Sequence, residues 1–422
     1  MMKTICYCLI ALILIGCTSA KQRIFKKIDN TLKADFFDSQ FTGFLLIDPQ
    51  TKDTLYNQNS SKYFTPASNT KIFTLYTSLK LLPEKIPALK YVFQNDTLFI
   101  EGTGDPTLLH PYFKDSTAIN FLKGHTNVSL YLDNFKEKKF GPGWSWDDYH
   151  WYYSPERSGF PMYGNILTLH QTDSLQVLPY YFIDKVVSIN HPVNREWDKN
   201  IFYFDPTRKD TLEIPFRVDS TLTHQLLENA LQKKVALAHR MPKAEKKVLY
   251  SIPSDSVYKR MMWESDNFLA EQLLILVSAT LSDTLNSARV REYVLEKHLS
   301  DLKQSPRWVD GSGLSRYNLF SPLSIVQVLE KLYADIPRES LFSLFPSGGV
   351  SGTLVDWYDG DTTPYMYAKS GSLGNNYCLS GYLLTKSGKV MIFSFMNNHF
   401  RNPTSEIKKR MQLIFETVRD AY

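Results

Sequence analysis

The segment that decides the fold reads Thr65-Pro66-Ala67-Ser68-Asn69-Thr70-Lys71-Ile72-Phe73-Thr74-Leu75-Tyr76. Pro66 suits the first turn of a helix, where its missing N–H loses no hydrogen bond. Ser68 and Lys71 are three residues apart, so a helix places both side chains on one face. A hydroxyl becomes a nucleophile when a neighbouring base takes its proton, and a buried amine with a lowered pKa can be that base. The segment predicts a helix, stopped by Pro83, that carries a Ser-x-x-Lys nucleophile.

This spacing is not specific by itself, because it recurs at Ser256/Lys259, Ser300/Lys303 and Ser405/Lys408. A second motif, Ser265-Asp266-Asn267, immediately precedes a predicted helix. A serine at such a turn can relay protons, and an asparagine can bind a substrate amide. The alternative is that Ser265 only caps the helix.

A third motif, Lys369-Ser370-Gly371, lies at the end of a predicted strand and is followed by Ser372. The lysine supplies positive charge for a substrate carboxylate, the hydroxyl supplies a hydrogen bond, and Gly371 lets the backbone approach a ligand closely. The same tripeptide at Lys386-Ser387-Gly388 lies between two apolar runs and predicts a hairpin turn. The motifs at 68–71, 265–267 and 369–371 therefore form one candidate site.

Composition excludes several classes of function. The chain has 422 residues, enough for two or three domains, with 43% hydrophobic and 22% charged residues. The net charge is +5 without a basic block, so we expect no nucleic-acid partner. Aromatic residues make up 14%, which suits sugar or peptide clefts as well as ordinary cores. The nine histidines show no metal-ligand spacing, so we predict no metal and no cofactor.

The N-terminus predicts export. An apolar run over residues 5–15 is too short to span a bilayer and fits a secretory signal peptide over residues 1–16. It ends Leu14-Ile15-Gly16-Cys17, which resembles a bacterial lipobox. That resemblance implies that Cys17 is lipidated and anchors the protein to a membrane, facing the periplasm of a Gram-negative bacterium. An ordinary signal peptide or a buried helix is the alternative.

Cysteine usage excludes a disulfide framework. Cys6 and Cys8 leave with the signal peptide and Cys17 carries the lipid, so only Cys378 remains. We expect Cys378 to be a small core residue.

The chain divides into two kinds of pattern. Residues 17–88 and 249–422 predict strands and a helix cluster, an α/β (α+β) domain with an antiparallel sheet. Residues 89–248 predict short strands, many turns and one late helix, which indicates an inserted, mostly β domain. The predicted helices are 22–40, 222–233, 255–262, 267–282, 285–298, 321–335 and 404–422, and the predicted strands are 41–48, 53–56, 91–93, 97–101, 128–132, 367–371, 378–385 and 390–397.

Longer strings make the pattern specific. They are Gly102-Thr103-Gly104-Asp105-Pro106-Thr107, Gly143-Trp144 through Asp148-Tyr149, Asp310-Gly311-Ser312-Gly313-Leu314-Ser315-Arg316 and Gly349-Val350-Ser351-Gly352-Thr353-Leu354. With the three motifs, and in the same order, they resemble the penicillin-binding D-alanyl-D-alanine carboxypeptidase/endopeptidase family, peptidase family S13. The resemblance covers nearly the whole mature chain and implies a serine β-lactamase/transpeptidase-like fold.

The resemblance also implies a mechanism. Ser68 attacks a D-Ala-D-Ala peptide bond of a peptidoglycan stem peptide and forms an acyl-enzyme. Lys71 is the general base and is kept neutral by Lys369. Ser265 relays a proton to the leaving D-alanine, and Asn267 holds Lys71 and the substrate backbone.

The remaining implied roles concern binding. The N–H groups of Ser68 and Ser372 form the oxyanion hole, while Ser370 and Ser372 with Lys369 bind the terminal carboxylate. A β-lactam enters the same way and stays attached. This chain departs from the family pattern in two ways. Its third motif is Lys-Ser-Gly, where the family has Lys-Thr-Gly. Its insertion is also shorter than in members with two inserted domains, which leaves endopeptidase preference open.

Other interpretations are kept open. They are a β-lactamase or esterase on the same scaffold, and a non-catalytic peptidoglycan-binding lipoprotein. Asp310 and Arg316 allow a functional charged pair, but a structural role for their loop is preferred.

Overall fold

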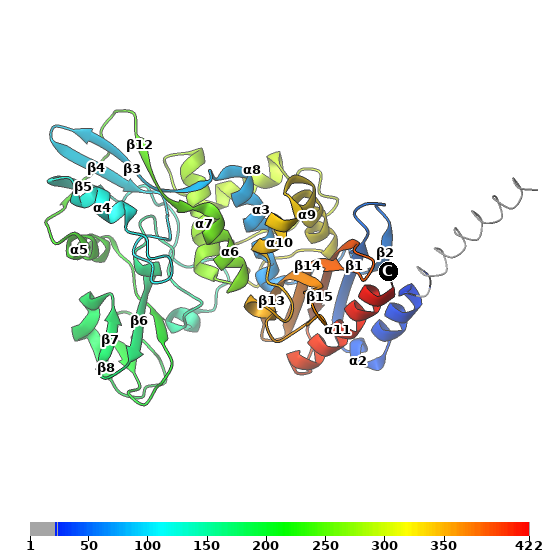
Figure 1. The fold of residues 1–422 in the computed structure, drawn as a ribbon. Coiled ribbons are helices and arrows are strands. Elements are labelled where there is room, and N and C mark those ends of the chain that lie inside the picture. The colour runs from blue at the N-terminus through cyan, green and yellow to red at the C-terminus, as the bar shows by residue number, and fades with distance from the viewer. Residues whose placement is uncertain (1–21, 23, 422) are drawn as a thin grey trace, which may run out of the picture.

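The computed structural model describes residues 22 and 24–421 (Figure 1). The predicted signal peptide and Cys17 lie outside the described residues. Within the described part of the chain, none of the helices combines the length and the apolar character that crossing a membrane requires.

A five-stranded antiparallel sheet is the centre of one half of the molecule, with strand order β13-β14-β15-β1-β2. Strand β1 pairs with both β2 and β15, so the two ends of the chain share one sheet. The Lys386-Ser387-Gly388 copy lies in the turn between β14 and β15, as predicted. The strands are β1 Phe41–Ile47, β2 Thr54–Gln58, β13 Met366–Leu373, β14 Asn376–Leu384 and β15 Val390–Asn398.

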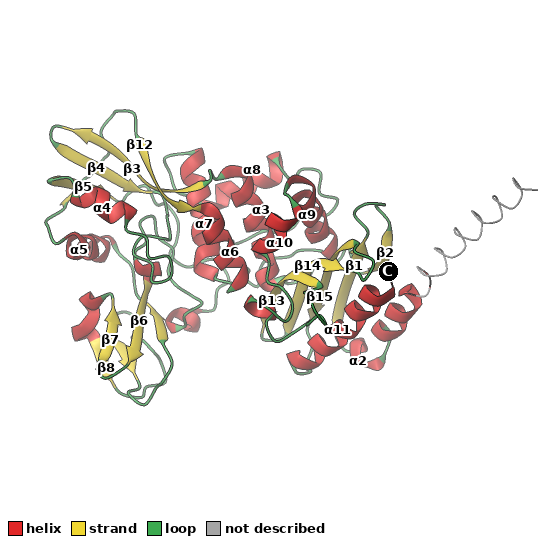
Figure 2. Cartoon of the chain, viewed as in Figure 1, coloured by secondary structure: helices red, strands yellow, loops and turns green. Residues whose placement is uncertain are grey.

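Helices cover both faces of this sheet (Figure 2). One face packs against a cluster of α3 Lys71–Leu81, α6 Ser254–Trp263, α7 Asn267–Leu281, α8 Ser287–Lys297, α9 Pro322–Asp335 and α10 Arg338–Leu344. Helix α11, Thr404–Ala421, lies on the other face with the helical residues 24–32 and α2 Asp35–Asp38. The single helix predicted over residues 22–40 is therefore wrong, because the chain turns at 33–34. The antiparallel sheet with a helix cluster confirms the predicted fold class.

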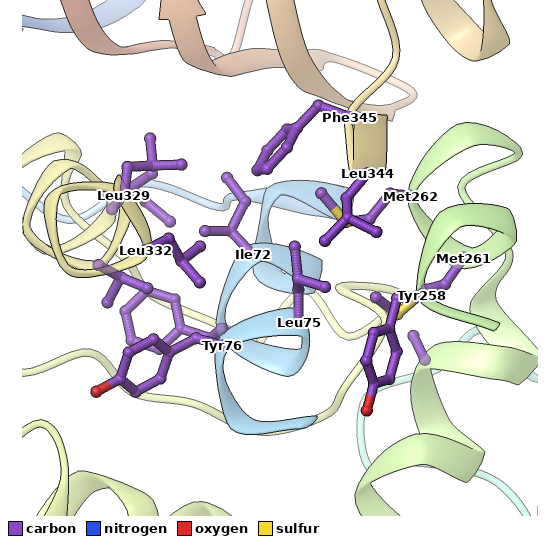
Figure 3. Close-up of a cluster of buried hydrophobic side chains, with 14 of the residues drawn as sticks. Ile72, Leu75, Tyr76, Tyr258, Met261, Met262, Leu329, Leu332, Leu344 and Phe345 are labelled. Atoms are coloured by element: carbon purple, nitrogen blue, oxygen red, sulfur yellow. The ribbon is translucent and has the colours of Figure 1, made fainter. Parts of the chain in front are cut away.

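The helix that follows Ser68 is fixed by packing. Figure 3 shows Ile72, Leu75 and Tyr76 of α3 surrounded by side chains from α6, α9 and α10. Helix α7, beside it, is buried at every position from Phe268 to Ala279. Most of these residues are apolar, and the buried polar side chains of Glu271 and Gln272 accept or donate hydrogen bonds. Close packing of this kind holds the start of α3 in one place.

The other half of the molecule is built on a second sheet, ordered β11-β5-β4-β3-β12. It has its own core, which includes Leu98, Ile100, Leu167 and Phe202. Its elements are β3 Lys85–Gln94, β4 Thr97–Gly102, α4 Thr117–Lys123, β5 Asn127–Tyr131, β6 Ile166–Gln171, β7 Leu175–Leu178, β8 Val186–Ser188, β9 Phe202–Phe204, β10 Leu212–Pro215, α5 Ser220–Leu231, β11 Ala236–Leu237 and β12 Lys247–Pro253.

Strands β3 and β12 cross the positions expected as domain boundaries, at 88/89 and 248/249. They pair with each other, and the register shifts beside Pro87. Proline is tolerated in a strand at such an irregularity, which is why β3 begins before the predicted strand at 91–93.

Candidate active site

Ser68 lies on a 3₁₀ turn, η1 Ala67–Thr70, immediately before α3 begins at Lys71. The turn is tighter than the α-helix predicted there. Ala67 has a left-handed φ of 48°, a strained conformation of the kind found at functional sites. Asn69 fastens the turn to the sheet, because its Nδ2 donates to the carbonyls of Lys369 at 3.0 Å and Cys378 at 3.3 Å. Cys378 is a fully buried core residue, as predicted.

Two glycines let other segments approach this turn. A Cβ on Gly313, which has a φ of +86°, would lie 1.8 Å from the carbonyl oxygen of Ala67. A Cβ on Gly371 would lie 2.7 Å from the carbonyl oxygen of Pro66 and 2.9 Å from the nitrogen of Ser68. Both positions therefore require glycine, and β13 can lie directly against the nucleophile turn.

Lys71 is fully buried, and its Nζ lies 3.0 Å from Ser68 Oγ. It also donates to Asn267 Oδ1 at 2.7 Å and to the carbonyl of Ser312 at 2.8 Å. A neutral amine has two hydrogens for these two acceptors, which leaves its lone pair facing the Ser68 hydroxyl. Burial lowers the pKa of Lys71 to about 8, although the nearby carboxylates of Asp266, Asp310 and Glu271 favour the charged form.

The second motif surrounds the start of α7. Ser265 has a left-handed φ of 57°, and Asp266 Oδ1 accepts from the Leu269 N–H at 2.9 Å as the helix cap. The alternative that Ser265 is the cap is therefore wrong. Asn267 Nδ2 donates to the carbonyl of Tyr153 at 2.9 Å, so its oxygen is directed at Lys71.

Lys369 of β13 is also fully buried. Its Nζ donates to Ser265 Oγ at 2.8 Å and to the carbonyl of Ser370 at 2.7 Å. Burial, and then the charge of Lys71, lower the pKa of Lys369 well below its usual range. We expected Lys369 to keep Lys71 neutral, but burial is the main cause of the lowered pKa of both amines. The charge of Lys71 lowers the pKa of Lys369, and not the reverse.

These groups meet at a cavity of about 910 Å³ between the two halves of the molecule. Ser370 Oγ donates to Thr353 Oγ1 at 2.7 Å, which places both hydroxyls at the wall. On the opposite side, Tyr152 and Glu213 belong to the half built on the second sheet. The predicted site residues on the cavity wall are Ser68, Ser265, Asn267, Ser370 and Ser372, with Lys71, Lys369 and Gly371 buried behind them.

Several contributors were missed by sequence reasoning. The carbonyls of Ser312 and Tyr153 hold Lys71 and Asn267, but a main-chain group has no signature in the sequence. Thr353 lies in the quoted stretch 349–354, although nothing there distinguished its hydroxyl.

The Asp310 carboxylate holds its own loop together. It accepts from the N–H groups of Gly313 at 2.8 Å and Ser315 at 2.6 Å, and from Trp144 Nε1 at 2.9 Å. These contacts favour the structural role, whereas Arg316 lines the cavity. Across residues 22 and 24–421, no three His, Cys, Asp or Glu side chains are grouped as a metal ion would need.

Comparison with known proteins identifies a family and a similar fold. Residues 24–174 and 208–418 match the sequence model of the D-Ala-D-Ala carboxypeptidase 3 (S13) family. The chain is 23% identical over 436 residues to D-alanyl-D-alanine carboxypeptidase DacB of Haemophilus influenzae, covering 88% of each chain. The crystal structure of penicillin binding protein 4 from H. influenzae has a similar fold, with a TM-score of 0.69, 20% identity and coverage of 92% of this chain and 97% of that one. The same protein complexed with a β-lactam gives a TM-score of 0.63 at 19% identity, covering 93% and 98%.

Proposed function

Because the chain belongs to the D-Ala-D-Ala carboxypeptidase 3 (S13) family, we propose that it is a serine D-Ala-D-Ala carboxypeptidase that acts on peptidoglycan stem peptides and is acylated by β-lactams. The observation that carries the proposal is the 3.0 Å contact between Ser68 Oγ and the buried Lys71 Nζ, at a cavity whose wall also holds Ser370 and Ser372. A nucleophile, a base and a carboxylate-binding strand then serve one substrate.

In the proposed reaction, Ser68 Oγ attacks the carbonyl of the terminal peptide bond and its proton passes to Lys71. Asn267 Oδ1 and the Ser312 carbonyl accept from the ammonium that forms. The proton then passes from Lys71 through Ser265, which Lys369 holds, to the nitrogen of the departing D-alanine, so Lys71 is neutral again when the acyl-enzyme has formed. The N–H groups of Ser68 and Ser372 stabilise the oxyanion, and losing one such donor costs roughly a hundred- to thousand-fold in rate.

The Lys369–Ser370–Ser372 edge of β13 binds the terminal carboxylate in this proposal. That carboxylate favours the charged form of Lys369, which burial otherwise disfavours. Water then hydrolyses the Ser68 ester and releases the shortened peptide.

Labelling with a fluorescent penicillin tests the proposal against its rivals. A band that persists on a denaturing gel supports a penicillin-binding carboxypeptidase. Rapid turnover without a band identifies a β-lactamase, and neither label nor D-alanine release identifies a non-catalytic binding protein. Digestion of purified peptidoglycan, with identification of the products, separates carboxypeptidase from endopeptidase action.

We also propose that residues 1–16 are a signal peptide and that Cys17 carries a lipid that anchors the enzyme facing the periplasm. Incorporation of labelled palmitate tests this, because Cys17→Ala should remove the label. Equal labelling of the Cys17→Ala variant would overturn the anchor.

We further propose that residues 89–248 form an inserted domain, supported by their own buried core.

A further inference from the structure

Two tryptophans on the surface of the inserted half are unusually exposed. Trp146 is 75% exposed and Trp197 is 51% exposed. Their ring centroids lie 6.1 Å apart with the planes at 81°, so the edge of one ring meets the face of the other. This pair of neighbouring exposed rings is here called the tryptophan platform. Large exposed aromatic surfaces commonly mark binding sites.

The tryptophan platform is held rigidly from below. Arg195, only 1% exposed, lies beneath it, and its guanidinium Cζ is 5.0 Å from the ring centroid of Tyr149. The Tyr149 ring in turn meets the Trp197 ring edge to face at 4.8 Å. The Arg195 guanidinium donates to the carbonyls of Tyr149, Glu196, Trp197, Lys199 and Pro215. One buried side chain thus joins the loop of Trp197 to the 3₁₀ helix η2 Trp146–His150 and to β10. A Trp197 ring held in this way binds with little loss of conformational entropy.

A small cavity of about 200 Å³ lies beside Trp197. Its wall includes Lys139, Glu156, Asp198 and Arg217. Lys139 already donates to the Val218 carbonyl and pairs with Glu156, and Arg217 donates to the Asp198 carbonyl, so a ligand can use only the hydrogen-bonding positions that these contacts leave. A pyranose ring has an apolar C–H face that stacks on an aromatic ring and a rim of hydroxyl and amide groups that form hydrogen bonds. An aromatic surface next to a few polar groups matches that chemistry.

Residues close to Trp146 in the chain lie on the wall of the catalytic cavity. Ser145 and Asp148, which flank Trp146 in the chain, line that cavity, and so does Tyr152, which is 64% exposed. A stem peptide of four or five residues reaches at most about 18 Å. The glycan strand that carries the peptide must therefore pass near the mouth while the peptide occupies the cavity.

We propose that the tryptophan platform and its adjoining cavity bind the amino-sugar glycan strand whose stem peptide enters the active site. This inference rests on the proposed function. Trp197 lies between the two ranges that match the family, 24–174 and 208–418, whereas Trp146 lies inside the first, so only the Trp197 side of the platform falls outside the pattern that the match covers.

Two substrates test the proposal: intact peptidoglycan and a soluble peptide ending in D-Ala-D-Ala. Trp197→Ala should lower kcat/KM on peptidoglycan roughly tenfold, as expected when a central aromatic contact is removed. The rate on the soluble peptide should be unchanged, and Trp197→Phe should recover most of the loss. A tetramer of N-acetylglucosamine should quench the tryptophan fluorescence of the wild type, with weaker binding to Trp197→Ala.

Phe93→Ala is the matched control, because Phe93 is a similarly exposed aromatic residue, at 57%, on β3. The proposal is overturned if peptidoglycan and soluble peptide lose rate equally, if neither changes relative to Phe93→Ala, or if the tetramer does not bind. A change in sedimentation alone would make the platform a protein contact and also overturn it. Penicillin labelling reports separately on folding and on the proposed function, since it needs no glycan.

Discussion

Lys71 and Lys369 are both fully buried amines within hydrogen-bond distance of a serine hydroxyl, at 3.0 Å from Ser68 and 2.8 Å from Ser265. Their surroundings differ. Three carboxylates, those of Asp266, Asp310 and Glu271, favour the charged form of Lys71. Among the described residues, Lys71 itself is the only charged group that shifts Lys369.

The two amines are the same residue type, so the surrounding charges decide which role each can take. The carboxylates hold the pKa of Lys71 at about 8 despite burial, so it can take and return a proton near neutral pH. Lys369 has no such support, so a negatively charged substrate group is what favours its charged form. The first amine suits a base and the second suits an anion site.

Replacing Ser68 or Ser265 should give the largest difference in penicillin labelling between the Ser68–Lys71 pair and the Ser265–Lys369 pair. Ser68→Ala removes the attacking oxygen and should abolish penicillin labelling completely. Ser265→Ala removes only a proton relay, so labelling should persist but proceed at least about a hundred-fold more slowly. Time courses of labelling measure both, and Ser256→Ala, from another Ser-x-x-Lys copy on α6, is the control. Labelling of Ser68→Ala would show that another residue is the nucleophile.

The pH dependence of acylation tests the role of Lys71. The base must be neutral to accept the Ser68 proton, and its pKa is about 8. The rate should therefore rise with pH and level off above the pKa, and at pH 6 it should be roughly one hundredth of the plateau. Stopped-flow acylation by a chromogenic β-lactam measures the profile. A rate that is flat or falls between pH 6 and 8 would contradict a neutral Lys71 base.

Lys369→Met tests the anion site with a pair of substrates. The wild type should prefer a peptide with a free terminal carboxylate over its amide. Losing the Lys369–Ser265 contact should slow both substrates alike, but the variant should lose about 10- to 100-fold more on the acid than on the amide, as for a lost hydrogen bond to a charged group. Lys386→Met is the matched control, because Lys386 opens the other Lys-Ser-Gly copy in the β14–β15 turn. An equal loss on acid and amide would indicate that Lys369 only supports the structure.

The sequence predicted the features that depend on a few adjacent residues, such as helix starts and turns. Ser321 caps α9 with a capping box, α7 follows the Ser265 motif, and the Lys386 copy forms a turn, because each depends on a few adjacent residues. The order of the three motifs then predicted that they meet, since one substrate must contact them all.

Contacts between distant segments were beyond this reasoning. The start of β3 depends on pairing with β12 across an irregularity at Pro87, and the close approach of other segments to the Ser68 turn depends on the absence of a side chain at Gly313 and Gly371. The cause of the lowered lysine pKa values is burial between helices and sheet. None of these has a signal within the segment concerned.

Asp266→Asn should produce the smallest effect, and it tests directly whether the carboxylates set the pKa of Lys71. The Asp266 charge raises the pKa of Lys71, so its removal should lower that pKa and move the acylation profile to lower pH by less than about one unit. Asparagine still caps α7, because its oxygen can accept from Leu269. Glu264→Gln is the control, since Glu264 lines the same cavity without shifting Lys71. The rate at pH 6 should rise a few-fold in Asp266→Asn alone, whereas a shift to higher pH would mean that the carboxylates do not set the pKa of the base.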